Sequence, residues 1–149
     1  MKAARAVAML SYRAYEGYGK TQSEKPNDKL DDFRAASYQK YQGEKLANRF
    51  NAFTYWLLTK MMDSHNVGRN RESIEAALQK IKAETLVIGI ENDVLYPISE
   101  QKYLAEHIPN AKFETIHSLF GHDGFLVEFD QFKKIVGNFL KESVLVSHK

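Results

Sequence analysis

An apolar run that ends in a carboxylate, followed later by a histidine among glycines, constrains the fold of this chain most. Residues 85–90 are mostly aliphatic and lead directly to Asp93. His122 comes after a second strand-like stretch, 112–117. Gly121 precedes it directly, and Gly124 follows two residues later. Because the carboxyl ends of parallel strands meet at one edge of a sheet, we expect Asp93 and His122 to lie close together. An acid and an imidazole placed in this way are two members of a catalytic triad.

The third member of such a triad is not evident in this chain. In the α/β-hydrolase fold the nucleophile precedes the acid and the histidine, on a Gly-x-Ser-x-Gly turn. No serine of the chain lies between two glycines at that spacing, and there is no cysteine to replace it. The serines are Ser11, Ser23, Ser37, Ser64, Ser73, Ser99, Ser118, Ser143 and Ser147. We therefore expect the C-terminal part of an enzyme whose nucleophile lies elsewhere.

Asp93 and His122 each have a structural alternative. Asp93 precedes Pro97 closely enough to form an Asx turn or a helix cap, and taken alone this role is favoured. His122 alone fits a surface loop. Taken together the two residues favour catalysis, because glycines allow a ligand to approach the imidazole and a carboxylate holds its tautomer.

The second half of the chain has the pattern of a parallel βαβ unit. Strands are predicted at 85–90 and 112–117, and helices at 99–107 and 131–141. Parallel sheets are covered on both faces and usually contain several strands, so the strand at 85–90 lacks a neighbour within this chain. The predicted fold class is therefore α/β, as two parallel strands with flanking helices from a larger sheet.

The first half is predicted to be helical. Helices are expected at 2–12, 30–50 with an interruption or bend at Gly43, 52–64 capped by Asn51, and 72–81 capped by Ser73, with a polar loop at 14–27. The helix at 52–64 is apolar almost all round and should be covered on more than one side. We predict a helical lid and dimerisation segment at 1–71 and a core segment at 72–149.

Composition excludes several other classes of protein. The 149 residues include no cysteine, which excludes disulfides and thiol catalysis and favours the cytoplasm. Lysine and arginine (21) nearly balance the acids (19) and are interleaved with them, which argues against a nucleic-acid partner. No apolar run is long enough for a membrane span, and no His/Cys cluster has metal-ligand spacing, so neither a membrane partner nor a metal is expected.

Three polar residues near these motifs have two interpretations each. Asp123 fits a helix cap, or a carboxylate that pairs with a substrate ammonium beside the base. Arg5 and Tyr12 share one face of the first predicted helix, where they fit either a binding site for a carboxylate or an ordinary solvated arginine and core-edge tyrosine. From the residues alone, the structural interpretation leads for all three.

Several ordered segments resemble the homoserine O-acetyltransferase family. They are 4–5, 11–13, 37–45, 49–52, 58–65, 93–97 and 120–126, and they span nearly the whole chain. The resemblance is to the C-terminal half of the family enzyme, from within the helical lid of an α/β-hydrolase fold. This sequence departs from the family in the loop at 66–70, where Asn66 and Asn70 replace the Asp and Gly that are frequent there.

The resemblance implies a reaction and a set of site residues. Asp93 and His122 would be the triad acid and base, while Arg5, Tyr12 and Asp123 would contact L-homoserine. Acetyl-CoA would serve as acyl donor to a serine in the missing N-terminal half, with no bound cofactor. The chain alone would be inactive, and it would pair as a homodimer through its lid helices.

Two other functions remain open at this point. The chain could serve as a non-catalytic helical dimerisation module with an inert Asp/His pair. A fragment of an esterase with the same fold would carry the same pair. The joint presence of Arg5 and Asp123 favours the acyltransferase, because a plain hydrolase has no need for contacts to an amino acid.

Overall fold

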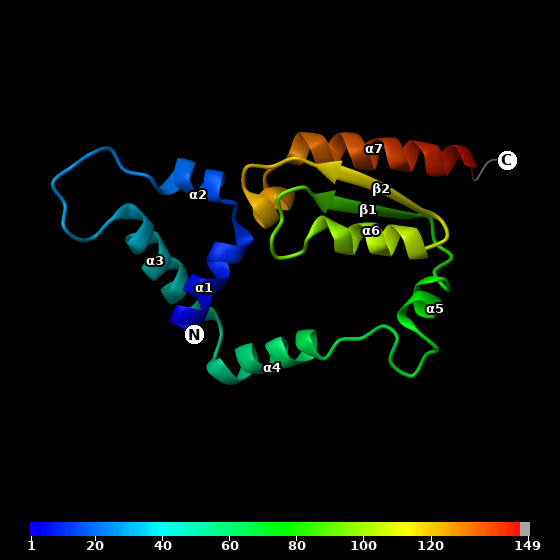
Figure 1. Ribbon diagram of the computed structural model, residues 1–149, viewed down its shortest axis with the longest axis horizontal. Helices are drawn as coiled ribbons and strands as arrows, with labels where there is room; N and C mark the ends of the chain where they lie inside the picture. The colour runs from blue at the N-terminus through cyan, green and yellow to red at the C-terminus, as the bar shows by residue number, and fades with distance from the viewer. Residues whose placement is uncertain (147–149) are drawn as a thin grey trace.

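A computed structural model describes residues 1–146 of the chain and shows a helical segment followed by a small α/β layer. In Figure 1 the helical segment lies to the left and below, and the α/β layer lies at the upper right. The predicted core segment 72–149 includes residues 147–149, which lie outside the described part. Among residues 1–146, no helix combines the length and the apolar character needed to cross a bilayer.

The α/β layer is the predicted parallel unit. β1 (Thr85–Ile90) pairs in parallel with β2 (Ala111–Ile116), and the register runs from the Thr85–Ala111 pair to the Ile90–Ile116 pair. The connecting helix α6 (Ile98–His107) lies along one face of the sheet, and α7 (Phe129–Val146) lies along the other (Figure 1). The prediction of two parallel strands with flanking helices is therefore confirmed.

The buried core is small and centres on the sheet. Val87 and Ile90 of β1, Ile116 of β2 and Ile108 after α6 are buried. Gly89 lies under α6, where a Cβ atom would come within 3.0 Å of the Ile98 side chain. This packing fixes the carboxyl ends of β1 and β2 side by side, so the segments that follow the two strands emerge at the same edge.

In the helical segment, α1 (Lys2–Tyr12) packs against α3 (Arg34–Arg49). They approach closely at Gly43, where a Cβ atom would lie 3.0 Å from the backbone oxygen of Lys2. The predicted interruption at Gly43 is not seen, because α3 is one continuous helix. The glycine allows the two helices to approach each other, and residues 30–33 precede the helix rather than belonging to it.

The polar loop predicted at 14–27 is partly wrong, because Tyr15–Gln22 forms helix α2. Gly17 and Gly19 make this stretch a poor helix in isolation. Gly17 is nevertheless buried against the segment after β2, where a Cβ atom would lie 2.1 Å from the backbone oxygen of Leu119. Tertiary packing therefore compensates for weak local propensity.

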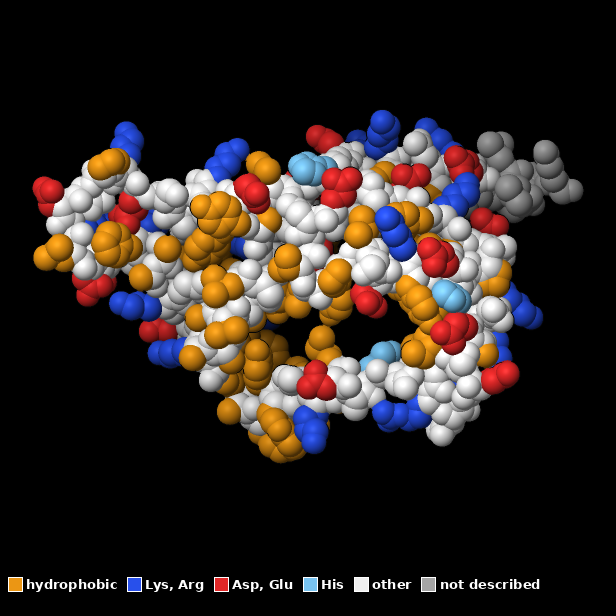
Figure 2. Space-filling model, in the orientation of Figure 1, with side chains coloured by type: hydrophobic (Ala, Val, Ile, Leu, Met, Phe, Trp, Pro, Cys, Tyr) orange, Lys and Arg blue, Asp and Glu red, His pale blue; other side chains and the backbone are white. Residues whose placement is uncertain are grey.

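Helix α4 (Ala52–Asp63) begins as predicted, since the Asn51 side chain accepts a hydrogen bond from the Thr54 backbone N–H at 2.8 Å. It contains no buried residue. Figure 2 shows an opening between α4 and the rest of the chain, with hydrophobic side chains along its rim. We expected this apolar helix to be covered on more than one side, but residues 1–146 do not cover it. The chain then forms α5 (Ile74–Leu78), whose first turn is capped by Ser73 as predicted.

Candidate active site

Asp93 and His122 form a hydrogen-bonded pair at the carboxyl edge of the sheet. Asp93 follows β1, and His122 lies in η1 (Gly121–Leu126), a 3-10 turn after β2. The Nδ1 atom of His122 lies 2.7 Å from Oδ2 of Asp93. The predicted proximity of the two side chains is confirmed. Because an ionised carboxylate only accepts hydrogen bonds, Nδ1 carries the hydrogen, and in the neutral imidazole Nε2 is the unprotonated nitrogen.

The second carboxylate oxygen of Asp93 organises the turn after β1. Oδ1 accepts hydrogen bonds from the backbone N–H groups of Leu95 (2.8 Å) and Tyr96 (2.9 Å). Asp93 is 8% exposed, and these bonds together with the histidine satisfy both of its oxygens. The Asx-turn interpretation and the triad interpretation are thus compatible, because each uses a different oxygen.

The segment that carries His122 is fixed to the end of β1. Asn92 donates a hydrogen bond to the backbone oxygen of Ser118 at 2.5 Å, and the Ser118 hydroxyl accepts one from the Phe120 N–H at 3.1 Å. Gly121 has a φ of 59°, in the left-handed region that favours glycine. The chain therefore turns sharply just before His122, which points the imidazole toward Asp93.

Aromatic rings surround the imidazole. The ring centroids of Tyr96 and Phe125 lie 5.3 Å from that of His122, and the centroid of Tyr12 lies 5.8 Å away. Tyr12 is among the residues predicted from the sequence, whereas Tyr96 and Phe125 are not. Their nearness in sequence to Asp93 and His122 is the signal that could have found them. The His122 side chain is 23% exposed, so the rings leave it partly accessible.

Arg5 reaches the same region through Tyr12. Its guanidinium carbon lies 5.2 Å from the centre of the Tyr12 ring, and the two residues share one face of α1. The Arg5 Nε atom is buried and has no hydrogen-bond partner among the described residues. An unpaired buried donor is costly, so this group is suited to an anionic ligand.

Asp123 is placed beside His122, and its charge is already paired. Its Oδ2 accepts a hydrogen bond from Nε of Arg13 at 2.9 Å, and each of the two side chains is 21% exposed. The helix-cap interpretation of Asp123 is wrong, because no side-chain cap bond forms at η1 and α7 begins only at Phe129. Sequence reasoning missed Arg13, which lies next to Tyr12 but contacts a residue far away in the chain.

The structure thus places Asp93 and Tyr12 against His122, with Asp123 next to it in η1 and Arg5 in contact with Tyr12. The arrangement can accept a proton at Nε2 while Asp93 stabilises the resulting imidazolium. Within residues 1–146, no group of three or more His, Cys, Asp or Glu side chains is placed to hold a metal ion. A hollow of about 310 Å³ lies elsewhere, between the sheet and α7, and is lined in part by Leu86 and Ile135.

Comparison with known protein sequences gives matches to homoserine O-acetyltransferases. The chain is 45% identical over 143 residues to a homoserine O-acetyltransferase of Cyclobacterium marinum, and 40% identical over 149 residues to one of Chlorobaculum tepidum. The alignments include 96% and 97% of this chain but 40% of each relative, so the chain spans about two-fifths of their length. No family model matches the chain.

Solved structures give the same fold. A homoserine O-acetyltransferase from Staphylococcus aureus superposes with a TM-score of 0.73 at 27% identity, over 93% of this chain and 40% of that one. The enzyme of that name from Bacillus anthracis gives a TM-score of 0.80 at 18% identity over the same shares. These matches establish a partial α/β-hydrolase fold. Over nearly its whole length the chain is similar to homoserine O-acetyltransferases, and it matches about 40% of their length.

Proposed function

We propose that this chain supplies the acid and base of an acyltransferase that moves an acetyl group from acetyl-CoA to the hydroxyl of L-homoserine, a step in methionine biosynthesis. The observation that carries the proposal is the 2.7 Å hydrogen bond between Asp93 and His122. In the neutral imidazole this bond leaves Nε2 as the unprotonated nitrogen, as a general base requires, and the His122 side chain is 23% exposed. The names of the relatives supply the acceptor, homoserine, and the transferred acetyl group. Acetyl-CoA as the donor is part of the proposal.

The proposed reaction uses a serine from a segment outside this chain. That serine carries the acetyl group as an ester, and Nε2 of His122 removes the proton of the homoserine hydroxyl as its oxygen attacks the ester carbonyl. The tetrahedral intermediate then expels the serine oxygen, which takes the proton back from His122. Asp93 keeps its negative charge throughout and stabilises the imidazolium. The chain alone therefore lacks activity, and it needs no bound cofactor.

Arg5, Tyr12 and Asp123 are proposed to bind homoserine. The unpaired Nε of Arg5 suits the carboxylate of the amino acid, and Tyr12 contacts both that guanidinium and the His122 ring. Asp123 would accept a hydrogen bond from the substrate ammonium through Oδ1, because Oδ2 is bonded to Arg13. A plain esterase has no use for this pairing of an arginine and a carboxylate.

Two further features belong to the proposal. The exposed apolar side chains of α4 support a homodimer through the helices between residues 30 and 64, because a partner would cover them. The absence of cysteine supports the cytoplasm.

The test is an exchange protein, in which this chain replaces the matching stretch of the C. marinum enzyme. Acetyl transfer to homoserine is compared with hydrolysis of a simple acetyl ester. The proposal expects transfer to homoserine to dominate. Ester hydrolysis without transfer would favour the esterase, and a folded dimer inactive in both assays would favour the dimerisation module.

A further inference from the structure

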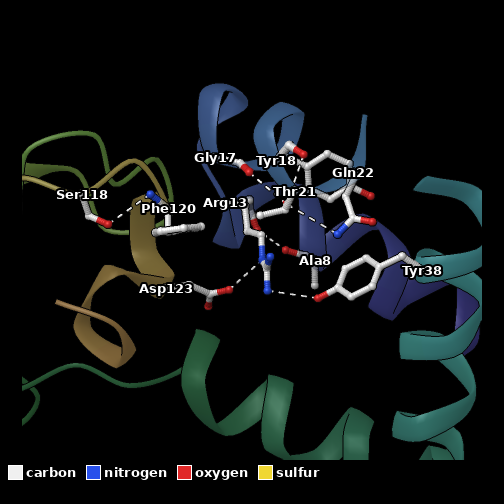
Figure 3. A network of polar contacts seen from close by, with 11 residues as sticks. Ala8, Arg13, Gly17, Tyr18, Thr21, Gln22, Tyr38, Ser118, Phe120 and Asp123 are labelled. Atoms are coloured by element: carbon white, nitrogen blue, oxygen red, sulfur yellow. Dashed lines mark hydrogen bonds and ion pairs between the residues drawn. The ribbon is translucent and has the colours of Figure 1, made fainter. Parts of the chain in front are cut away.

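Arg13 connects three parts of the molecule that lie far apart in the sequence. It follows α1, and its Nε donates a hydrogen bond to Asp123 of η1 at 2.9 Å. Its second guanidinium nitrogen donates to the hydroxyl of Tyr38 on α3 at 3.0 Å. Figure 3 shows the guanidinium between these two side chains, at the junction of α1, α3 and η1. The planar guanidinium is thus held at both ends, which fixes its orientation toward Asp123.

The backbone around Arg13 presses against the same segment. A Cβ atom on Gly121 would lie 2.8 Å from the backbone nitrogen of Ala14, and one on Gly17 would overlap the backbone oxygen of Leu119. Both glycines and Ala14 are buried. Residues 13–17 therefore cover the turn at 119–121 on the side away from the sheet.

The sheet holds the other side of the turn, through the bond from Asn92 to the Ser118 backbone oxygen. Between Ser118 and Asp123 the chain is thus fixed at both ends, by Asn92 at one end and by Arg13 at the other. His122 lies next to the second of these points. Its bond to Asp93 requires the turn to hold one conformation, and restraining the turn lowers the entropy cost of that alignment.

We propose that Arg13 is a positioning residue for His122. Through its ion pair with Asp123 it restrains η1, so that the imidazole remains bonded to Asp93 while Nε2 faces the substrate side. This proposal rests on the proposed role of His122 as base. It also assigns the helical segment a task beyond substrate contact, since Arg13 and Tyr38 both come from it.

The proposal is tested by NMR on the 149-residue chain, without substrate. The readouts are the exchange with water of the His122 Nδ1 hydrogen and of the amides between 118 and 128. For Arg13→Gln we expect about tenfold faster exchange at both, with the β1 and β2 amides unchanged. Arg13→Lys should restore most of the protection, because an ammonium can still pair with Asp123. Lys2→Gln is the matched control, since it removes an exposed ion pair between α1 and α3 that lies away from η1.

Asp123→Asn provides a second route to the same measurement if Arg13→Gln does not fold. It removes the charge of the partner at nearly constant volume, and it should speed exchange in 118–128 alone. Unchanged exchange, or an equal increase in β1 and β2, would overturn the proposal for either variant. The NMR readout needs no catalysis, so the test stands even if the exchange protein has no acetyltransferase activity. If the exchange protein is active but hydrogen exchange is unchanged in Arg13→Gln, the proposed function stands and only the role of Arg13 is refuted.

Discussion

Asp93 bonds to His122 through one carboxylate oxygen while its other oxygen accepts two backbone N–H groups of the following turn. The two roles can be separated by substitution. Asp93→Asn keeps an oxygen for the turn but cannot accept from Nδ1 with its amide nitrogen. Asp93→Ala loses both roles.

We therefore expect Asp93→Ala to lower the free energy of unfolding by about 2–4 kcal/mol and Asp93→Asn by about 1 kcal/mol. Urea denaturation of both variants measures the difference. Equal losses would show that the turn bonds of Asp93 contribute little to stability.

Two nearby glycines of α2 should respond oppositely to alanine. Gly17 has no room for a Cβ atom beside Leu119, so Gly17→Ala should cost about 1–3 kcal/mol of stability. Gly19 has no neighbouring atom within 4 Å of a built Cβ, so Gly19→Ala should stabilise the chain by about 0.5–1 kcal/mol. Thermal unfolding of the two variants compares them directly. A stabilising Gly17→Ala would mean that α2 does not pack on Leu119.

The contact between α5 and α6 should make stability depend on pH. The hydroxyl of Tyr103 donates a hydrogen bond to Glu75, and chiefly for this reason the pKa of Glu75 falls from 4.5 to about 2. A lowered folded-state pKa gives stability that is present above the unfolded value and is lost as the pH falls below 4.5 toward 2.

Tyr103→Phe should therefore be less stable than wild type at pH 6, and the difference should shrink as the pH falls below 4.5. Unfolding midpoints measured from pH 6 down to pH 3 test this. Tyr41→Phe is the control, because Tyr41 makes a ring contact with Lys45 and has no described hydroxyl partner. A constant difference between wild type and Tyr103→Phe would contradict the assignment.

The exposed face of α4 should mediate self-association. Phe53, Trp56, Met61 and Met62 are between 53% and 68% exposed. A two-fold dimer that buries about 800 Å² on each partner would cover such a face. Trp56→Glu combined with Met61→Glu should convert the dimer to a monomer in sedimentation at tens of micromolar, whereas Thr59→Glu should not. A wild-type monomer, or a dimer that survives the double substitution, would exclude this interface.

Local sequence was sufficient for the sheet and for the pairing of Asp93 with His122. The strand at β1 and the glycines around His122 are short-range signals, and the parallel geometry brings them to one edge. Helix α2 was missed because Gly17 and Gly19 disfavour a helix locally, while burial of Gly17 against Leu119 stabilises it. Arg13 could not be predicted for a similar reason, because its partners Asp123 and Tyr38 are distant in sequence and close only in the folded chain.

Asn70 shows how structure explains a departure from a family pattern. It has a φ of 58°, in the left-handed region that favours glycine, and the sequence resemblance implies glycine at this position in the family. Asparagine tolerates this conformation better than most residues, so the turn is retained without glycine.

The role of His122 as base is tested most directly by the rate of acetyl transfer from acetyl-CoA to homoserine in the exchange protein, with and without His122. We expect measurable transfer with the native chain, a loss of at least about 10³-fold in kcat for His122→Ala, and no activity in the isolated 149-residue chain. Transfer that survives His122→Ala, or turnover by the isolated chain that His122→Ala abolishes, would contradict it.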